Sequence, residues 1–283
     1  MKKGLVVEGG GMRAVFVCGC MDALLEHDIE MDYVIGVSAG IANAASYISK
    51  QKGRAIAVAT EFSNDKRYMG FRNFLDPKNK SYFGIDFMFR VIPETLSPFD
   101  YEQFDKFKGE VIAVISNVET GKAEYRDLMK DPFRDDVLIA SCSLPMMFPV
   151  RKIQGKKYLD GGLCDPMPIR QAIKDGCDRI LVISTREKEY RKKPEMMDRA
   201  AIRLLKEHKN FVNAIVRRPH VYNYCMDIVD HLEKEDRIKV IRPHDTKDFS
   251  RTEKDVEKMM QLYQEGYDLV ESRIEELKEY FGI

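Results

Sequence analysis

The most constraining feature of this 283-residue chain is an order repeated near its start: apolar strand, glycine-rich turn, helix. Residues 4–8 (GLVVE) read as the first strand, GGGMRA follows, and a helix is expected from about 13 to 27. A second strand (MDYVIGV, 31–37) runs into Ser38 and a helix of small residues. This alternation predicts the opening of a mainly parallel sheet covered by helices.

Later segments extend the same pattern. Residues 110–118 and 179–185 read as buried strands, the first followed by a hairpin return over ETGKAEYRD, and 237–243 reads as a last strand. A helix is expected over about 195–216. No repeat or low-complexity linker divides the chain, so residues 1–283 are predicted to form one domain. Its motif-bearing core spans about 4–185, and the segment 186–283 is less defined.

The final segment is predicted to be one long helix. Ser250 and Glu253 form a capping box before it. An apolar stripe then recurs at steps of four and three: Val256, Met260, Tyr263, Tyr267, Val270, Ile274, Leu277 and Phe281. The stripe would also suit a coiled-coil seam, but Gly266 interrupts it, which favours a helix lying on the sheet.

Charge and composition limit the function classes. Lys plus Arg and Asp plus Glu number 46 each, and this balance gives no support to nucleic-acid binding. Lys2 and Lys3 precede an apolar stretch, but Glu8 and Arg13 interrupt it, so a secretory signal is not expected. The six cysteines show no metal-binding spacing, and we expect reduced thiols in a cytoplasmic protein without a metal or cofactor.

Ser38 lies between two glycines, in Gly36-Val-Ser38-Ala-Gly40, where a strand meets a helix. One interpretation is a serine that caps the helix. The other is a nucleophile elbow, in which small residues two before and two after the serine permit a sharp turn that lifts the hydroxyl clear of the backbone. The separate glycine cluster and the small residues after the turn favour the nucleophile.

The glycine cluster at residues 9–11 has more than one interpretation. Followed by Met12, Arg13 and Ala14, it fits the dinucleotide fingerprint, but no acidic residue ends the second strand to hold a ribose. A turn without any ligand is also open. The alternative we favour is an oxyanion hole, in which the amides around Gly9, Gly10, Gly11 and Met12 converge on one point. Arg13 would hold this loop or attract an anionic head group.

A nucleophilic serine needs a base. Histidines follow Ser38 at 208, 220, 231 and 244, and only His244, just after a strand, stands near a suitable loop. Asp160 precedes Gly161 and Gly162, which allow a tight loop and close approach, so its carboxylate is a candidate to accept the serine proton directly. A plain turn aspartate is an equally open interpretation of this motif by itself.

Together these segments resemble the patatin-like phospholipases. The resemblance rests on GGGMR (9–13), GVSAG (36–40), DGG (160–162) and the block ASCSLPMMFP (140–149), in family order over about the first 165 residues. It implies a three-layer α/β/α sandwich with a mainly parallel sheet, Ser38 as nucleophile, Asp160 as base, the glycine loop as oxyanion hole and no metal. The family usually has glycine where Ala14 stands, which puts the detailed shape of the loop in doubt.

The expected reaction is hydrolysis of lipid or phospholipid acyl esters. An acyltransferase using the same dyad and a non-catalytic lipid-binding protein are the alternatives. The aromatic-rich stretch 64–107 is a candidate wall or lid for an acyl chain, or an ordinary core. The basic residues Lys188–Lys193, with Arg217 and Arg218, suggest transient membrane contact or a solvated face. The sequence leaves the oligomeric state open.

Overall fold

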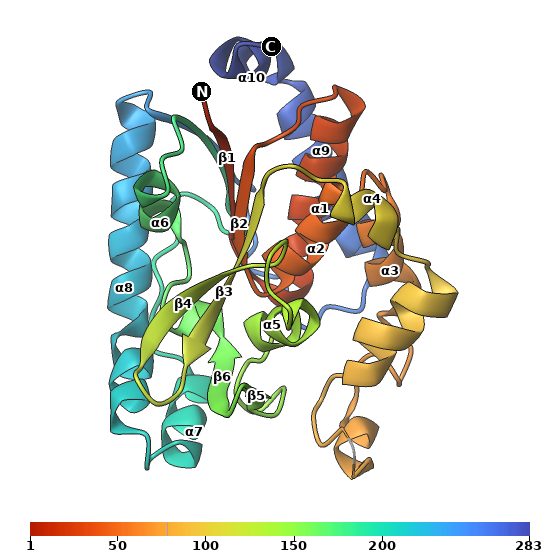
Figure 1. Ribbon diagram of the computed structural model, residues 1–283, viewed down its shortest axis with the longest axis vertical. Coiled ribbons are helices and arrows are strands. Elements are labelled where there is room, and N and C mark those ends of the chain that lie inside the picture. Colours follow the sequence, from red (N-terminus) through yellow and green to blue (C-terminus); the bar gives the residue numbers. More distant parts are fainter. Residues whose placement is uncertain (78) are drawn as a thin grey trace.

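An eight-stranded mixed sheet lies between two layers of helices (Figure 1), in a computed structural model that describes residues 1–77 and 79–283. Its order is β5-β6-β3-β2-β1-β7-β8, and β4 pairs with β3 beside this path. The strands are β1 (Lys3–Val7), β2 (Tyr33–Val37), β3 (Glu110–Asn117), β4 (Lys122–Asp127), β5 (Arg151–Ile153), β6 (Lys156–Asp160), β7 (Arg179–Ile183) and β8 (Ile238–Ile241).

Parallel pairing dominates the sheet. The pairs β1–β2, β2–β3, β1–β7 and β7–β8 are parallel, and β3–β4, β3–β6 and β5–β6 are antiparallel. Strand β2 is buried along its whole length, which explains its continuous apolar sequence. The predicted three-layer α/β/α sandwich with a mainly parallel sheet is therefore confirmed.

Helices cover both faces of the sheet. The helices and helical turns are η1 (Gly11–Ala14), α1 (Val15–Glu26), α2 (Ala39–Ile48), α3 (Arg54–Phe62), η2 (Phe71–Leu75), η3 (Phe87–Leu96), α4 (Tyr101–Asp105), α5 (Arg134–Ser141), η4 (Gly161–Leu163), α6 (Ile169–Lys174), α7 (Met196–Leu204), α8 (Lys209–Lys234), α9 (Val256–Glu271) and α10 (Ile274–Phe281). In Figure 1, α6 and α8 lie to the left of the sheet, and α1, α2, α3 and α9 lie to its right.

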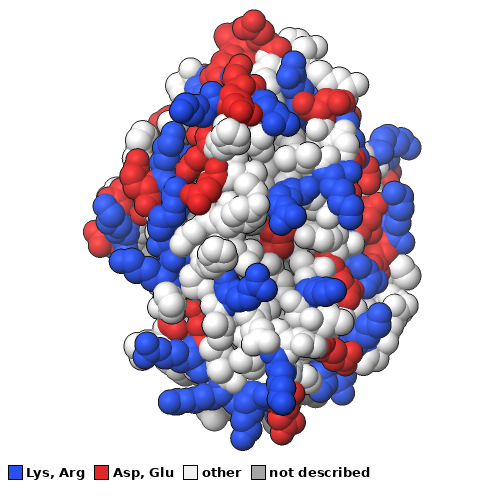
Figure 2. Space-filling view, turned by 90° about the vertical axis from the view of Figure 1, so that its left-hand side faces the viewer, with Lys and Arg blue, Asp and Glu red and all other residues white. Residues whose placement is uncertain are grey.

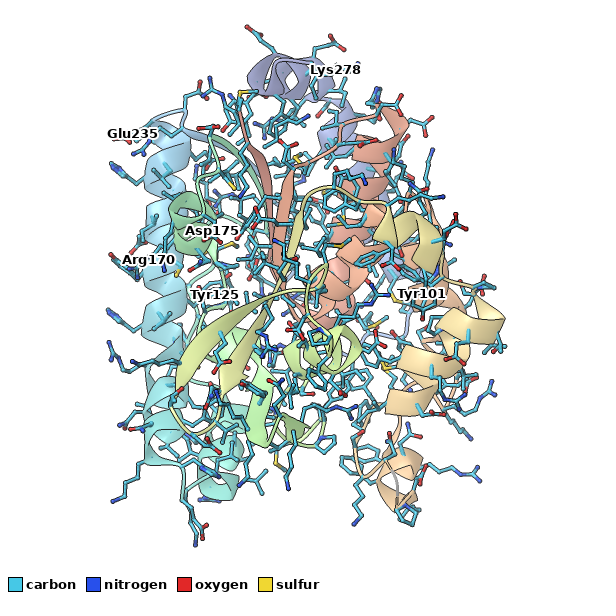
Figure 3. The ribbon with its side chains drawn as sticks, in the orientation of Figure 1. Tyr101, Tyr125, Arg170, Asp175, Glu235 and Lys278 are labelled. Carbon is cyan, nitrogen blue, oxygen red and sulfur yellow. The ribbon has the colours of Figure 1, made fainter. Side chains whose placement is uncertain are left out.

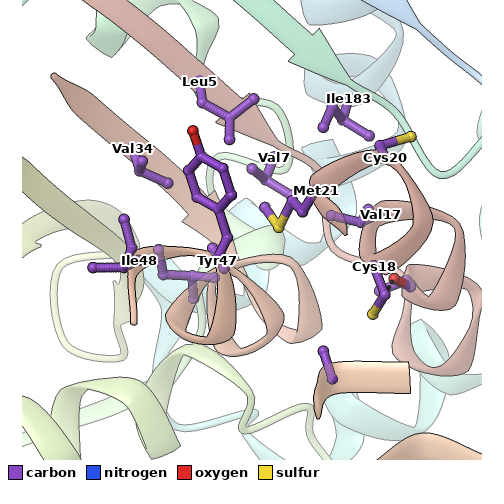
Figure 4. Packing of buried hydrophobic residues seen from close by; sticks show 14 of the residues in the cluster. Leu5, Val7, Val17, Cys18, Cys20, Met21, Val34, Tyr47, Ile48 and Ile183 are labelled. Atoms are coloured by element: carbon purple, nitrogen blue, oxygen red, sulfur yellow. Dashed lines mark hydrogen bonds between the residues drawn. The ribbon is translucent and has the colours of Figure 1, made fainter. Parts of the chain in front are cut away.

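Alternate residues of a strand pack into two separate hydrophobic cores, one on each face of the sheet. Leu5 and Val7 join the core under α1 and α2, whereas Val6 faces the core under α6 and α8. Figure 4 shows the first of these, where Tyr47 of α2 stands against the sheet beside Leu5. Because successive side chains of a strand point to opposite faces of the sheet, one continuous apolar sequence packs against both layers of helices.

Helix α9 packs on α1 at a very close crossing. A Cβ atom added to Gly19 of α1 would lie 1.9 Å from the Tyr263 carbonyl oxygen, and one added to Gly266 of α9 would lie 2.3 Å from the Phe16 carbonyl oxygen. The backbones can approach this closely because each helix presents a glycine to the other. Gly266, which interrupts the predicted stripe, is therefore the contact point of the two helices.

Several predicted boundaries in the C-terminal segment are wrong. The helix predicted over 195–216 is two helices, because α7 ends at Leu204 and α8 begins at Lys209 and continues past Pro219. The predicted final helix is divided between α9 and α10. It is capped by Asp255, whose side chain accepts hydrogen bonds from the amides of Glu257 and Lys258, and not by the predicted capping box.

The predicted apolar stripe is wrong at its start and confirmed further on. Val256 and Met260 are exposed (39% and 41%), and Met259 and Leu262 are buried there instead. Val270, Leu277 and Phe281 of the stripe are buried as predicted. This helix packs on α1, while β8 joins the sheet beside β7. The assignment of residues 1–283 to one domain stays a prediction.

Two further properties concern the whole described chain. Among its helices, none combines the length and apolar character needed to cross a bilayer. All six cysteines are free thiols, four of them buried and Cys164 and Cys177 partly exposed.

Candidate active site

Ser38 occupies a strained turn between β2 and α2. Its backbone has φ 55° and ψ −135°, a combination that costs a non-glycine residue about 1–3 kcal/mol. It stands at the N-cap of α2, yet its hydroxyl makes no capping hydrogen bond to any described residue. The geometry therefore departs from the helix-cap interpretation.

The glycines beside Ser38 allow the turn to pack. A Cβ atom on Gly40 would lie 2.5 Å from the Glu8 carbonyl oxygen, and one on Gly36 would lie 3.0 Å from the Ile41 amide nitrogen. Larger residues at either place would push α2 away from the ends of β1 and β2. This is the steric requirement that the sequence pattern predicted for a nucleophile elbow.

Residues at the end of α5 accept hydrogen bonds from the backbone amides of both candidate catalytic residues. The Ser38 amide donates to the Ser141 hydroxyl (3.0 Å), which in turn donates to the Val114 carbonyl (2.8 Å). Two residues later, the Ser143 carbonyl accepts from the Asp160 amide (2.9 Å). Ser141 and Ser143 are both buried. The block at 140–149, noted in the sequence only for its resemblance, thus links the turn at Ser38 to Asp160.

Asp160 is almost fully buried, with 2% of its surface exposed. Its Oδ1 accepts a hydrogen bond from the Gly162 amide (2.8 Å), whereas Oδ2 has no partner with full hydrogen-bond geometry among the described residues. Burial raises the pKa of this carboxyl, and the neighbouring Ser38 hydroxyl, followed by the Gly162 amide, opposes that rise. The structure therefore brings Ser38 and Asp160 together.

The glycine loop lies beside them, with one correction. Within residues 1–77 and 79–283, the amides of Gly9, Gly10 and Gly11 have no hydrogen-bond acceptor. The Met12 amide, by contrast, donates to the Arg251 carbonyl (3.0 Å). Met12 was expected to be an oxyanion donor, but its amide is already occupied, and its side chain lines a cavity instead.

Two cavities meet at Ser38. The large cavity, of about 940 Å³, is lined mostly by apolar side chains, and the small cavity, of about 60 Å³, is lined mostly by polar ones. Both are lined by Gly11, Ser38, Leu144, Arg186 and Arg251. The candidate nucleophile therefore faces an apolar space on one side and a charged space on the other.

The aromatic stretch 64–107, in which residue 78 lies outside the described residues, forms part of the large cavity. Tyr68, Phe83 and Phe104 line it, and so does Tyr101 of α4, across the sheet from Tyr125 in Figure 3. Tyr68 and Phe104 are also buried core residues. The stretch is thus both wall and core, and its role as a lid stays a prediction.

The histidine alternative has no geometric support. His244 is exposed over 79% of its side chain and its Nδ1 lies 2.7 Å from Glu265. Among the described residues that line either cavity, none is a histidine.

The sequence interpretation missed a set of charged residues around the small cavity. Arg186 lies just after β7, at the carboxyl end of a parallel strand, a place where such folds carry ligand sites. That position was a usable signal. Arg251 precedes α9 in a loop with no motif, and only the folded chain brings it to Ser38.

The predicted basic patch is divided by the fold. Lys192 and Arg218 are buried, with 6% and 8% of their surfaces exposed, and both line the small cavity. Arg191 pairs with Asp227 and Asp230 of α8. Over most of the α8 face, basic and acidic side chains are interspersed (Figure 2). Membrane contact stays a prediction, but these two buried residues take no part in an exposed patch.

Comparisons with known proteins indicate the family of the chain. The family model described as patatin-like phospholipase matches residues 5–173, and a domain of unknown function (DUF6363) matches residues 208–282. An uncharacterized Escherichia coli protein, YjjU, is 26% identical over 64% of this chain and 51% of its own length. The Aspergillus niger protein named lysophospholipase nte1 is 25% identical over 64% of this chain and 12% of its own length.

The chain thus spans about half of the first of these relatives and a small part of the second. The family match itself covers more than half of the chain, from within β1 to within α6, and includes both Ser38 and Asp160. The chain belongs to the patatin-like phospholipase family.

Proposed function

We propose that this protein is a serine hydrolase that cleaves acyl esters of lipids, with Ser38 as nucleophile and Asp160 as base. The observation that carries the proposal is the place of Ser38, on a strained turn beside a buried carboxylate where an apolar and a polar cavity meet. Family membership supports lipid acyl hydrolysis at the level of the class.

In the first half-reaction, Asp160 accepts the Ser38 proton while Oγ bonds to the ester carbonyl carbon. The amides of Gly10 and Gly11 point their free N–H groups at the oxyanion, and one such donor is worth roughly 3–4 kcal/mol in the transition state. The carbon–oxygen bond to the alcohol then breaks, and the alcohol leaves with the proton from Asp160.

In the second half-reaction, Asp160 takes a proton from water while the resulting hydroxide adds to the acyl carbon. The bond to Ser38 Oγ breaks, Oγ regains the proton, and a fatty acid is released. The base serves both halves because its proton is returned each time. None of these steps uses a metal or a cofactor.

The large cavity supports a lipid substrate. Its walls are mainly aliphatic and aromatic side chains, and its volume of about 940 Å³ is within the range of small-molecule sites. The Aspergillus niger relative carries the name lysophospholipase, which suggests a lipid with a single acyl chain.

Covalent labelling tests the nucleophile. A fluorophosphonate probe is expected to attach to the peptide that carries Ser38, since only an activated serine attacks it at a useful rate. The adduct is located by mass spectrometry of digested protein. Ser272, an exposed serine after α9, is the internal control and is expected to stay unlabelled. An adduct elsewhere, or none, would contradict the assignment and favour a non-catalytic lipid-binding protein.

Product analysis separates hydrolysis from acyl transfer. With a lipid alcohol added as acceptor, a hydrolase is expected to release free fatty acid as its main product. A new ester as the main product would indicate an acyltransferase that uses the same acyl-enzyme.

The pH dependence follows from the buried carboxylate. Asp160 accepts a proton only when ionised, and burial raises its pKa. As the pH is lowered, kcat/KM is therefore expected to fall with a midpoint above about 3.9, the pKa of an exposed aspartate. Activity is lost as the pH falls, whereas the stabilising effect of Asp160 is lost as the pH rises. Because the pKa of Asp160 is higher in the folded than in the unfolded chain, its contribution to the free energy of unfolding disappears as the pH rises through the folded pKa. A pH profile of kcat/KM measures the acid limb, and a limb in the ordinary range would contradict this role.

A further inference from the structure

The small cavity beside Ser38 is rich in cations. It is lined by two carboxylates and by five cationic side chains. The cations are Arg13, Arg186, Lys192, Arg218 and Arg251. Apart from Arg13, all follow residue 173, where the match to the patatin-like family ends. The segment after the family match therefore supplies most of the charge next to the candidate nucleophile.

Two of these cations lack a salt-bridge partner among the described residues, although the charge of Glu8 acts on Arg13 from across the cavity. Neither Arg13 nor Arg186 forms an ion pair with a described residue. Arg186 donates to the Thr246 hydroxyl (3.0 Å) and stacks over the Tyr190 ring at 4.2 Å. A guanidinium at the edge of a cavity without a carboxylate partner is available to an anionic ligand.

Arg13 is the stronger sign of a missing partner. Only 5% of its surface is exposed, and its Nε has no hydrogen-bond partner among the described residues. Its Nη1 donates a long hydrogen bond to the Phe249 carbonyl (3.5 Å). Burial, followed by the like charges of Arg186 and Arg251, lowers the pKa of Arg13 to about 10. Buried polar groups are normally satisfied, so this arrangement suits a bound anion.

The remaining charges near the cavity are already paired. Glu195 binds both Lys192 (2.5 Å) and Arg251 (2.9 Å), and Arg218 pairs with Asp198 (3.1 Å).

Glu8, one of the two carboxylates that line the cavity, is hydrogen-bonded by Ser184, Thr185 and Tyr222. The other is Asp160, which faces Ser38. Glu8 thus has its own hydrogen-bond donors, and Arg13 and Arg186 are the cations of this cavity that lack a salt-bridge partner among the described residues.

We propose that Arg13, Arg186 and Arg251, here called the cationic subsite, bind the phosphate group of an anionic single-chain lipid whose acyl chain occupies the large cavity. Arg186 and Arg251 line both cavities, so a phosphate held by them lies on the polar side of the ester that Ser38 attacks. Guanidinium groups suit a phosphate because their paired N–H donors match its oxygens. The segment after residue 173 then determines head-group specificity.

This inference rests on the proposed function for its substrate, and its test separates the two. Octanoyl glycerol phosphate and monooctanoyl glycerol share an ester and differ in the phosphate. The wild-type protein is expected to have the higher kcat/KM for the phosphate ester. In Arg186→Gln, the ratio of the two kcat/KM values is expected to fall about tenfold or more, since a charge-assisted hydrogen bond is lost. Arg186→Lys is expected to recover part of the ratio.

Arg186 is the suitable position because its replacement leaves no carboxylate unpaired, and thermal unfolding checks that the variant is folded. The matched control is Arg237→Gln, which removes an exposed arginine that pairs with Glu235 at the end of α8. The control is expected to keep the wild-type ratio. An unchanged ratio in Arg186→Gln would overturn the proposal, as would equal losses on both esters, which would instead indicate a role in stabilising the oxyanion.

Binding gives a second readout that needs no turnover. Calorimetry with Ser38→Ala is expected to show octanoyl glycerol phosphate binding more tightly than monooctanoyl glycerol, and Arg186→Gln in that background is expected to remove the difference. If no ester is hydrolysed but this difference is found, the proposed function fails and the subsite stands. Inorganic phosphate is expected to compete only weakly. Competition by phosphate as strong as by the lipid would show a free-anion site and overturn the head-group assignment.

Discussion

Ser38→Ala and Asp160→Asn are each expected to lower kcat for a soluble p-nitrophenyl ester by about three orders of magnitude or more. The alanine removes the atom that bonds to the acyl group. The asparagine keeps the shape of Asp160 and an oxygen for the Gly162 amide, but its amide cannot accept the serine proton. Both losses are measured as initial rates on protein whose thermal unfolding matches that of the wild type.

Asp165→Asn is the matched control for Asp160. Asp165 stands five residues on in the same loop, and burial raises the pKa of its carboxyl too, but it accepts a hydrogen bond from Tyr125 (2.7 Å) and lines neither cavity within the described residues. Its variant is expected to keep activity within a few-fold. Wild-type turnover in Asp160→Asn would reject the dyad. An inactive His244→Ala together with an active Asp160→Asn would establish a conventional triad.

Gly19→Ala is expected to lower the free energy of unfolding by about 3 kcal/mol. The added methyl group would stand 1.9 Å from the Tyr263 carbonyl oxygen, so α1 and α9 must separate. In an unobstructed helix the same change would be stabilising by up to about 1 kcal/mol, because alanine is a better helix former than glycine. The sign of the change therefore reports whether the two helices touch.

Urea unfolding measures this effect. Gly70→Ala serves as control, since a Cβ atom there would meet nothing closer than the Lys66 carbonyl oxygen at 3.6 Å, and its extended backbone accepts alanine. The control is expected to change stability by less than about 0.5 kcal/mol. If Gly19→Ala proves neutral or stabilising, the close crossing of α1 and α9 is wrong.

The first half of the fold could be predicted because local signals agree there. Apolar runs such as that of β2 mark buried parallel strands, and the glycines around Ser38 mark the turn that follows. The C-terminal half was harder. Pro219 lies inside the long helix α8, and Val256 and Met260 fit a helical period while facing solvent. These features depend on tertiary packing, which cannot be predicted from the periodicity of apolar residues alone.

The candidate site divides in the same way. Ser38 was found because it lies between two glycines and Asp160 because two glycines follow it, and the fold brings them together, although their catalytic roles stay proposals. Arg186 has only its position after β7 as a signal, and Arg251 has none. Their meeting depends on β7, on the loop before α9 and on the ion pair of Arg251 with Glu195, which are contacts between segments remote in the chain.

The hydrogen bond from the Met12 amide to the Arg251 carbonyl has a bearing on protein engineering. It fastens the glycine loop to a segment outside the stretch shared with the patatin-like family. A chimera that kept only the shared stretch, or a protease nick ahead of α9, would release one wall of the loop while every recognised motif stayed intact. Inspection for intact motifs would therefore overestimate the competence of such a fragment.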